Sequence, residues 1–231
     1  MYIVIIQKRD VKREKFMASF PRSPRLRKGA IISLDMPSLS PQVVIFQYNP
    51  DTLTRTLTPK TSQSKTGKAE TLRLDGPPEE DIELDIELDA TDQLENPDQN
   101  PTAVQTGVNT QLAALEMILY PKSSSVIANA ALAALGTIEV VPPEGPFTLF
   151  VWGPSRVLPV KITKFRISEE AYDTELNPIR AKVSLTMKVL TYVDLQQSHI
   201  GYALYLANQI SKEIMATVGS VNNMGSIGAT F

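Results

Sequence analysis

The sequence feature that most constrains the fold is a strict alternation of carboxylates and apolar side chains. It reads Asp81, Ile82, Glu83, Leu84, Asp85, Ile86, Glu87, Leu88 and Asp89. Successive side chains of a β-strand point to opposite faces of its sheet. The pattern therefore predicts a strand with one face in a core and the other face in water.

The solvated face of this strand carries five carboxylates, spaced by about 6.6 Å along the strand. Between Asp75 and Asp98 there are eleven acidic residues and no lysine or arginine. Like charges placed in this way repel one another. Three interpretations are open, in order of preference: a solubilising face, a surface that meets a basic partner, and a calcium site. The last is disfavoured because strand carboxylates do not curl around an ion as a loop can.

Strands are predicted in two blocks, from β-prone runs bounded by Pro, Ser and Asn turns. The first block comprises residues 30–34, 42–48, 52–58 and 81–89, and the second comprises 147–152, 156–167 and 179–193. A helix is predicted from Asn100-Pro101, with an apolar stripe at Val104, Val108, Leu112, Leu115 and Leu119. The order predicts a mainly β, α+β fold, namely an antiparallel β-sandwich or barrel with a central helical insert and a C-terminal helix.

The predicted organisation is one β domain at 30–195 that contains the insert 100–136. A helix at 196–218 and a Gly/Ser/Asn-rich, flexible tail at 219–231 follow it. Residues 1–29 form a basic arm with nine Lys/Arg against Asp10 and Glu14, a net charge of 9 − 2 = +7 within a chain of net −2. Such an arm is a solvated leader (or an over-extended start, with Met17 as initiator), or it binds an acidic partner or nucleic acid. Nucleic acid is not expected, because the arm lacks interleaved aromatic residues.

Composition excludes several chemistries and locations. The chain has no cysteine, which removes disulfides, thiolate nucleophiles and zinc–thiolate sites. No apolar run approaches the roughly 20 residues of a membrane span, so direct membrane insertion is not expected. The apolar start precedes the basic residues, which is the reverse of a secretory signal. We therefore expect synthesis in the cytoplasm without a signal peptide.

No catalytic, cofactor-binding or metal residue is predicted. His199 is the single histidine, and no nucleophile elbow, phosphate-binding loop or His–carboxylate metal motif is present. The carboxylates could supply a glycosidase acid–base pair, but a regular strand face gives them no contrasting environments. An enzyme or a carbohydrate-binding or other ligand-binding β-sandwich therefore stays as the alternative class.

Three stretches, taken in order, resemble the contractile injection system tube-protein family. Residues 44–53 resemble its F-x-(Y/F)-N-P strand–turn–strand, residues 84–89 its acidic strand, and residues 176–183 its late L-N-P-x-R-A-x-V turn and strand. The similarity spans about residues 30–195. The matching turn residues are Phe46, Tyr48, Asn49, Pro50, Asn177, Pro178 and Arg180.

The resemblance implies a structural role in the baseplate of a phage-tail-like particle. It implies a homo-oligomer, in the form of a hexameric ring, that acts as a tube initiator or adaptor and joins the spike to the inner-tube subunits, beside other baseplate proteins. The alternatives are a bulk inner-tube subunit and a phage tail or baseplate protein. Family members often carry a C-terminal LysM module, and residues 219–231 leave no room for one, so the resemblance is to a short form.

Two groups of charged residues are candidates for assembly interfaces or for the lumen of such a ring. One is the carboxylate face, with a preference for the lumen, and the other is the polar loop 59–69, which could reach a neighbouring copy. The candidates are Asp81, Glu83, Asp85, Glu87, Asp89, Lys60, Lys65 and Lys68.

Overall fold

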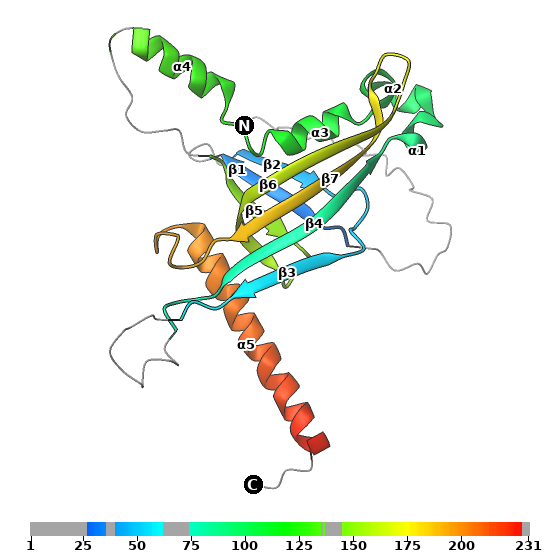
Figure 1. Cartoon of the computed structure of the whole chain (residues 1–231). Coiled ribbons are helices and arrows are strands. Elements are labelled where there is room, and N and C mark those ends of the chain that lie inside the picture. The colour runs from blue at the N-terminus through cyan, green and yellow to red at the C-terminus, as the bar shows by residue number, and fades with distance from the viewer. Residues whose placement is uncertain (1–26, 36–39, 62–73, 135, 137–144, 228–231) are drawn as a thin grey trace, which may run out of the picture.

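The computed structural model describes residues 27–35, 40–61, 74–134, 136 and 145–227. These residues form a seven-stranded antiparallel sheet in the order β2-β1-β5-β6-β7-β4-β3 (Figure 1). The strands are β1 (Ala30–Asp35), β2 (Ser40–Ile45), β3 (Leu53–Thr58), β4 (Glu79–Asp89), β5 (Phe147–Val151), β6 (Val157–Tyr172) and β7 (Pro178–Val189). Both predicted blocks of strands therefore lie in one sheet, and the mainly β, α+β class is confirmed.

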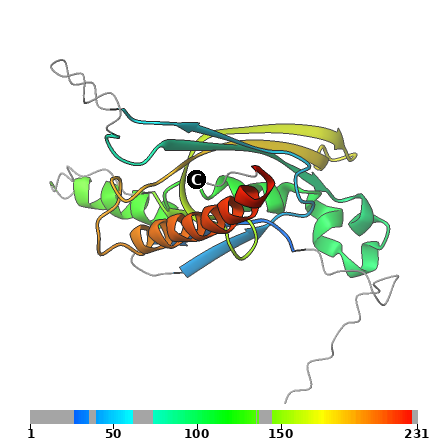
Figure 2. The ribbon, with the colours of Figure 1, turned by 90° about the horizontal axis from the view of Figure 1, so that it is seen from below.

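The sheet is open, so the expected closure into a barrel does not occur, and the described strands form one sheet and not the two of a sandwich. The cause is the strand order: β1 pairs with β5 and β4 pairs with β7, which places β2 and β3 at opposite edges although they are consecutive in sequence. The sheet instead curls, so that its two limbs lie on opposite sides of the core (Figures 1 and 2).

The alternating strand is β4, and its apolar face lines the core as predicted. Ile82, Leu84, Ile86 and Leu88 are all buried. They lie opposite Met187, Leu185, Val183 and Ala181 of β7, which are buried as well. Burying an aliphatic side chain contributes about 1.5–3 kcal/mol, so this double row fixes the β4–β7 register, because a one-residue slip would turn it to the solvent.

Five helices and a short 3₁₀ turn complete the described fold. They are α1 (Thr91–Leu94), η1 (Pro97–Gln99), α2 (Pro101–Thr106), α3 (Asn109–Glu116), α4 (Ser123–Ala134) and α5 (Ile200–Ile227). In Figure 1, α3 lies at one end of the curled sheet and α5 at the other. The core joins residues of α3 to residues of five strands.

The helix predicted from Pro101 is divided at Gly107 into α2 and α3. Gly107 has φ of 55°, a value that favours glycine and that ends α2. The next residue, Val108, donates its N–H to the Pro178 carbonyl oxygen at 2.9 Å. Because of this break, only the middle of the predicted stripe, from Val108 to Leu115, lies in the core, whereas Val104 and Leu119 are exposed.

Helix α5 begins at Ile200 and continues to Ile227, so part of the stretch 219–231 is helical where the composition predicts a tail. The Gly201 N–H donates to Nδ1 of His199 at 3.0 Å, and the His199 ring packs edge-on against Phe147 with 4.5 Å between ring centroids. His199 therefore caps this helix through its side chain. None of the described helices is long and apolar enough to cross a membrane.

Candidate functional site

The solvated face of the sheet carries charges in columns. The acidic column is Asp81, Glu83, Asp85, Glu87 and Asp89 of β4, whose side chains are exposed or half-buried. The antiparallel register places Lys188, Thr186, Ser184, Lys182 and Arg180 of β7 directly beside them. The acidic column therefore lies next to a partly basic one, a pairing that its own stretch of sequence does not reveal.

Ion pairs join β4 to β7 at three points. Lys182 Nζ lies 3.0 Å from Asp85 Oδ2, and Arg180 Nε lies 3.0 Å from Asp89 Oδ2. Lys188 Nζ lies 3.2 Å from Oε2 of Glu79, at the start of β4. Exposed pairs of this kind contribute little to stability, because solvent screens them. Their main effect is to offset the repulsion expected along the acidic column.

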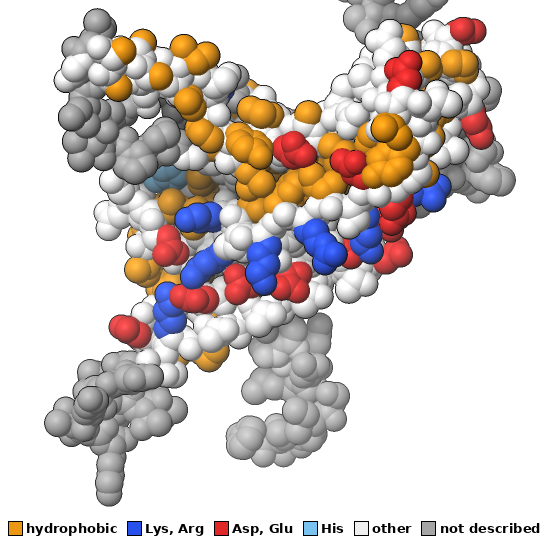
Figure 3. All heavy atoms as spheres, turned by 45° about the horizontal axis from the view of Figure 1, so that its top comes forward, with side chains coloured by type: hydrophobic (Ala, Val, Ile, Leu, Met, Phe, Trp, Pro, Cys, Tyr) orange, Lys and Arg blue, Asp and Glu red, His pale blue; other side chains and the backbone are white. Residues whose placement is uncertain are grey.

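A third column on β6 is basic. Lys161, Lys164 and Arg166 are exposed and lie beside Lys188, Thr186 and Ser184 of β7. Figure 3 shows rows of Lys and Arg next to rows of Asp and Glu on this face. The face is therefore mixed in charge, with most carboxylates towards β3 and most cations towards β5, apart from Glu170 of β6 beside Arg180.

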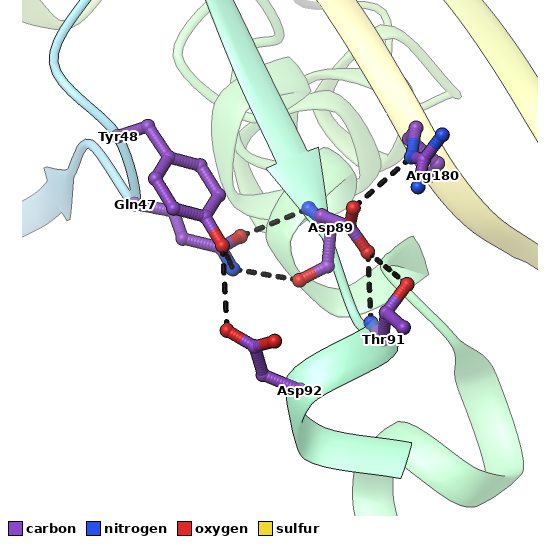
Figure 4. A network of polar contacts seen from close by, with 6 residues as sticks. All are labelled: Gln47, Tyr48, Asp89, Thr91, Asp92 and Arg180. Carbon is purple, nitrogen blue, oxygen red and sulfur yellow. Dashed lines mark hydrogen bonds and ion pairs between the residues drawn. The ribbon is translucent and has the colours of Figure 1, made fainter. Parts of the chain in front are cut away.

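The first family-like motif fastens residues 46–49 to the end of β4 (Figure 4). Phe46 is buried in the core. The next side chain, Gln47, donates to the Asp89 carbonyl oxygen at 2.6 Å and accepts from the Asp89 N–H at 3.0 Å. The side-chain amide of Gln47 thus bonds both the N–H and the C=O of Asp89, as the backbone of a neighbouring strand would. Asn49 fastens the same motif to the residues before β1: its side chain accepts from the Gly29 N–H and donates to the Arg27 carbonyl oxygen.

Asp89 is the centre of this junction. Its carboxylate accepts from the N–H of Thr91 at 2.8 Å and from the Thr91 hydroxyl, and it pairs with Arg180. The hydrogen bonds from Thr91 and then the Arg180 guanidinium hold the pKa of Asp89 below its usual value. Tyr48 and Asp92 lie at the edge of the same network, with 3.5 Å between Oη and Oδ2.

We expect Asp89→Asn to flatten the acid dependence of stability. A lowered folded-state pKa means that the ionised carboxylate stabilises the fold above the unfolded pKa, near 3.9, and that this stabilisation is lost as pH falls through the folded pKa. Urea midpoints measured from pH 7 downward should therefore fall less steeply below about pH 4 in the variant than in the wild type. Asp98→Asn, at an exposed site on η1, is the control, and equal slopes for Asp89→Asn and the wild type would contradict the assignment.

The second family-like motif joins the β6–β7 turn to the helices. Asn177 donates to Oδ2 of Asp173 at 2.9 Å and to the Gln105 carbonyl oxygen at 3.1 Å. The neighbouring Pro178 carbonyl accepts from Val108. The hydrogen bonds that the side chain and then the N–H of Asn177 donate to Asp173 hold the pKa of Asp173 below its usual value. Asn177 and Pro178 are therefore structural in this chain, since they position α2 and α3.

The predicted lysines are not brought together with the acidic column as a group. Lys60 pairs with Glu79 at 3.0 Å, at the start of β4. Lys65 and Lys68 lie outside the described residues, as does most of the loop 59–69. The residues that sequence reasoning missed are Gln47, Lys182 and Lys188. Only a prediction that β4 pairs with β7 could have found the two lysines.

Two clefts open on this side of the molecule. The larger, of about 970 Å³, lies between the loop 47–52 and the acidic column and reaches Lys182 of β7. The smaller, of about 380 Å³, lies between Tyr48, Asp89 and Arg180. Within the described residues, no group of three or more Asp, Glu or His side chains is placed to hold a metal ion.

The strand order and the two Asn-Pro junctions define the class of protein as a mainly β, α+β protein with an open antiparallel sheet. The chain belongs to the contractile injection system tube protein family, whose sequence model matches residues 25–198. The match includes both Asn-Pro motifs and the acidic strand. The family is a structural one, so the chain is a structural component of a contractile injection system particle. A search of the curated proteins gave no match.

Proposed function

We propose that the chain is a tube initiator or adaptor that forms a hexameric ring and joins the spike of the particle to its inner tube, among other baseplate proteins. The observation that carries the proposal is the open sheet. Its two edge strands, β2 and β3, expose large apolar side chains, namely Val43 at 51%, Ile45 at 61% and Leu57 at 48%.

Within the described residues these edges carry few of the devices that usually prevent edge-to-edge pairing, although α3 contacts β2 where Gln42 donates to the Ala114 carbonyl oxygen at 2.8 Å. Edge strands of monomeric proteins carry outward charges, bulges or prolines. β2 has no charged residue and has Pro41 only near its start, and the single charge of β3, Arg55, pairs with the buried Glu80 at 2.6 Å. Pairing of β2 of one copy with β3 of the next would continue the sheet around a ring. In such a ring we place the acidic column on the lumen side, because that face is hydrated in the single chain.

The ring is tested by placing charges on one edge. We expect Val43→Lys combined with Ile45→Lys to leave the chain folded, because both side chains are already exposed, and to convert a hexamer into monomers in light scattering and electron microscopy. Val126→Lys combined with Ile127→Lys, at exposed apolar sites on α4, is the matched control. A hexamer that survives the edge charges, or a wild-type monomer that joins no particle, would contradict the ring.

The position of the ring in the particle is tested by copy number. An adaptor forms one ring per particle, a single layer between spike and tube. A bulk inner-tube subunit forms many stacked rings. Quantitative mass spectrometry of purified particles, with electron microscopy of the layer that carries the tagged chain, separates these two roles.

A further inference from the structure

The larger cleft contains an unpaired piece of β-strand. The pairing of β3 with β4 stops at Leu84. Beyond it, the hydrogen bonds of Gln47 show that the N–H and C=O groups of Asp89 point away from β7. The next residue shows the opposite direction, as expected for a strand: the Ala90 N–H points towards β7 and donates to the Ile179 carbonyl oxygen. Backbone groups alternate with a period of two, so those of Asp85 and Glu87 face the cleft, and none of the described strands pairs with them there.

The walls of the cleft are acidic. Four carboxylates and two ammonium groups line it, which gives a net charge of 2 − 4 = −2. Lys182 is already paired with Asp85, and Lys28 donates to the Gln47 carbonyl oxygen at 3.0 Å. Glu83 and Glu87 take part in none of the ion pairs formed by the described residues. The ligand that fits is therefore a peptide segment that offers backbone groups to β4 and Lys or Arg side chains to these carboxylates.

The chain itself supplies such a segment. Residues 1–26 contain seven Lys/Arg and two acidic residues, a net charge of 7 − 2 = +5, and they lie outside the described residues. The segment is attached at the cleft: its successor Arg27 is bound through its carbonyl oxygen by Asn49, and Asn49 and Lys28 both line the cleft. Attachment at the rim gives a high effective concentration.

From this geometry we propose that the cleft between the loop 47–52 and the Asp85–Glu87 edge of β4 binds the basic segment 1–26 of the same chain. The contact covers part of the acidic column. Any other basic partner of this column would therefore compete with the segment for the same carboxylates. The inference concerns the single chain and does not depend on the ring.

The test uses the absence of cysteine in the full chain. Ala18→Cys and Thr56→Cys place one spin label in the segment and one on β3, outside the cleft lining, and their separation is measured by electron–electron double resonance. We expect a narrow distance component at low salt that is lost at high salt, because the contact is ionic. We also expect Glu83→Gln combined with Glu87→Gln to remove most of this component. The matched control, Glu95→Gln combined with Asp98→Asn, removes two exposed carboxylates elsewhere and should keep it.

Three outcomes would overturn the proposal. The first is the absence of a narrow component in the labelled wild-type chain. The second is a component that persists unchanged in the Glu83→Gln, Glu87→Gln variant while circular dichroism shows a folded chain. The third is a component that appears only between two singly labelled chains, which would assign the segment to the cleft of a second copy.

Discussion

Gly107→Ala is expected to lower the free energy of unfolding by about 3 kcal/mol. A Cβ atom at this position would lie 2.1 Å from the Pro178 carbonyl oxygen. That oxygen is backbone and already accepts from the Val108 N–H, so relief of the clash requires α2 and α3 to move off the β6–β7 turn. The positive φ adds strain for any residue with a side chain. Urea denaturation followed by circular dichroism measures the loss.

The control for this prediction is Gly153→Ala. Gly153 also has a positive φ, of 76°, but an added Cβ there would meet nothing within 4 Å. Its substitution should therefore show only the conformational cost, about 1 kcal/mol. If the two variants lose equal stability, the close approach of Gly107 to Pro178 does not limit the fold.

Glu80→Gln is expected to lower the free energy of unfolding by about 3 kcal/mol. The Glu80 side chain is only 5% exposed and lies 2.6 Å from Arg55 of β3 and 3.3 Å from Lys212 of α5. The amide removes the one carboxylate that both cations contact and leaves the half-buried Arg55 without a charged partner. Because Glu80 joins β4 to both β3 and α5, we also expect faster amide hydrogen exchange in α5.

Glu79→Gln is the matched control for this second prediction, since it removes the neighbouring carboxylate. Glu79 is 40% exposed and pairs with Lys60 and Lys188. Its pKa is lowered, first by the hydrogen bond from Lys60, but solvent screening keeps the contribution of such exposed pairs small. Similar losses for the two variants would mean that burial of Glu80 adds nothing.

The strands could be predicted from the sequence because their signals are local. The alternation from Asp81 to Asp89 depends only on which side chains enter the core, and the structure places Ile82 to Leu88 there. The strand predicted at 52–58 likewise corresponds to β3. Turn residues gave the strand ends to within a few residues, since Pro and Asn restrict the backbone wherever they occur.

The charge pattern of the face could not be predicted, because it depends on pairing between distant segments. Asp85 lies beside Ser184 and meets Lys182 only when β4 pairs with β7. The barrel was predicted wrongly for the same reason: nothing local states that β2 and β3 end at opposite edges. The break at Gly107 was missed because the apolar spacing runs through it, whereas the turn at Pro178, far along the chain, sets its position.

The junction at Gln47 has a consequence for association. The segment 46–52 connects the two open edges of the sheet, and the paired amide bonds to Asp89 fix it at one point within the single chain. The separation of the edges is therefore set before any partner arrives. A strand that adds to either edge therefore meets an ordered template. Binding then costs less conformational entropy, because the edge itself does not have to be ordered. Gln47→Ala should accordingly slow or weaken assembly although the residue lies at neither edge.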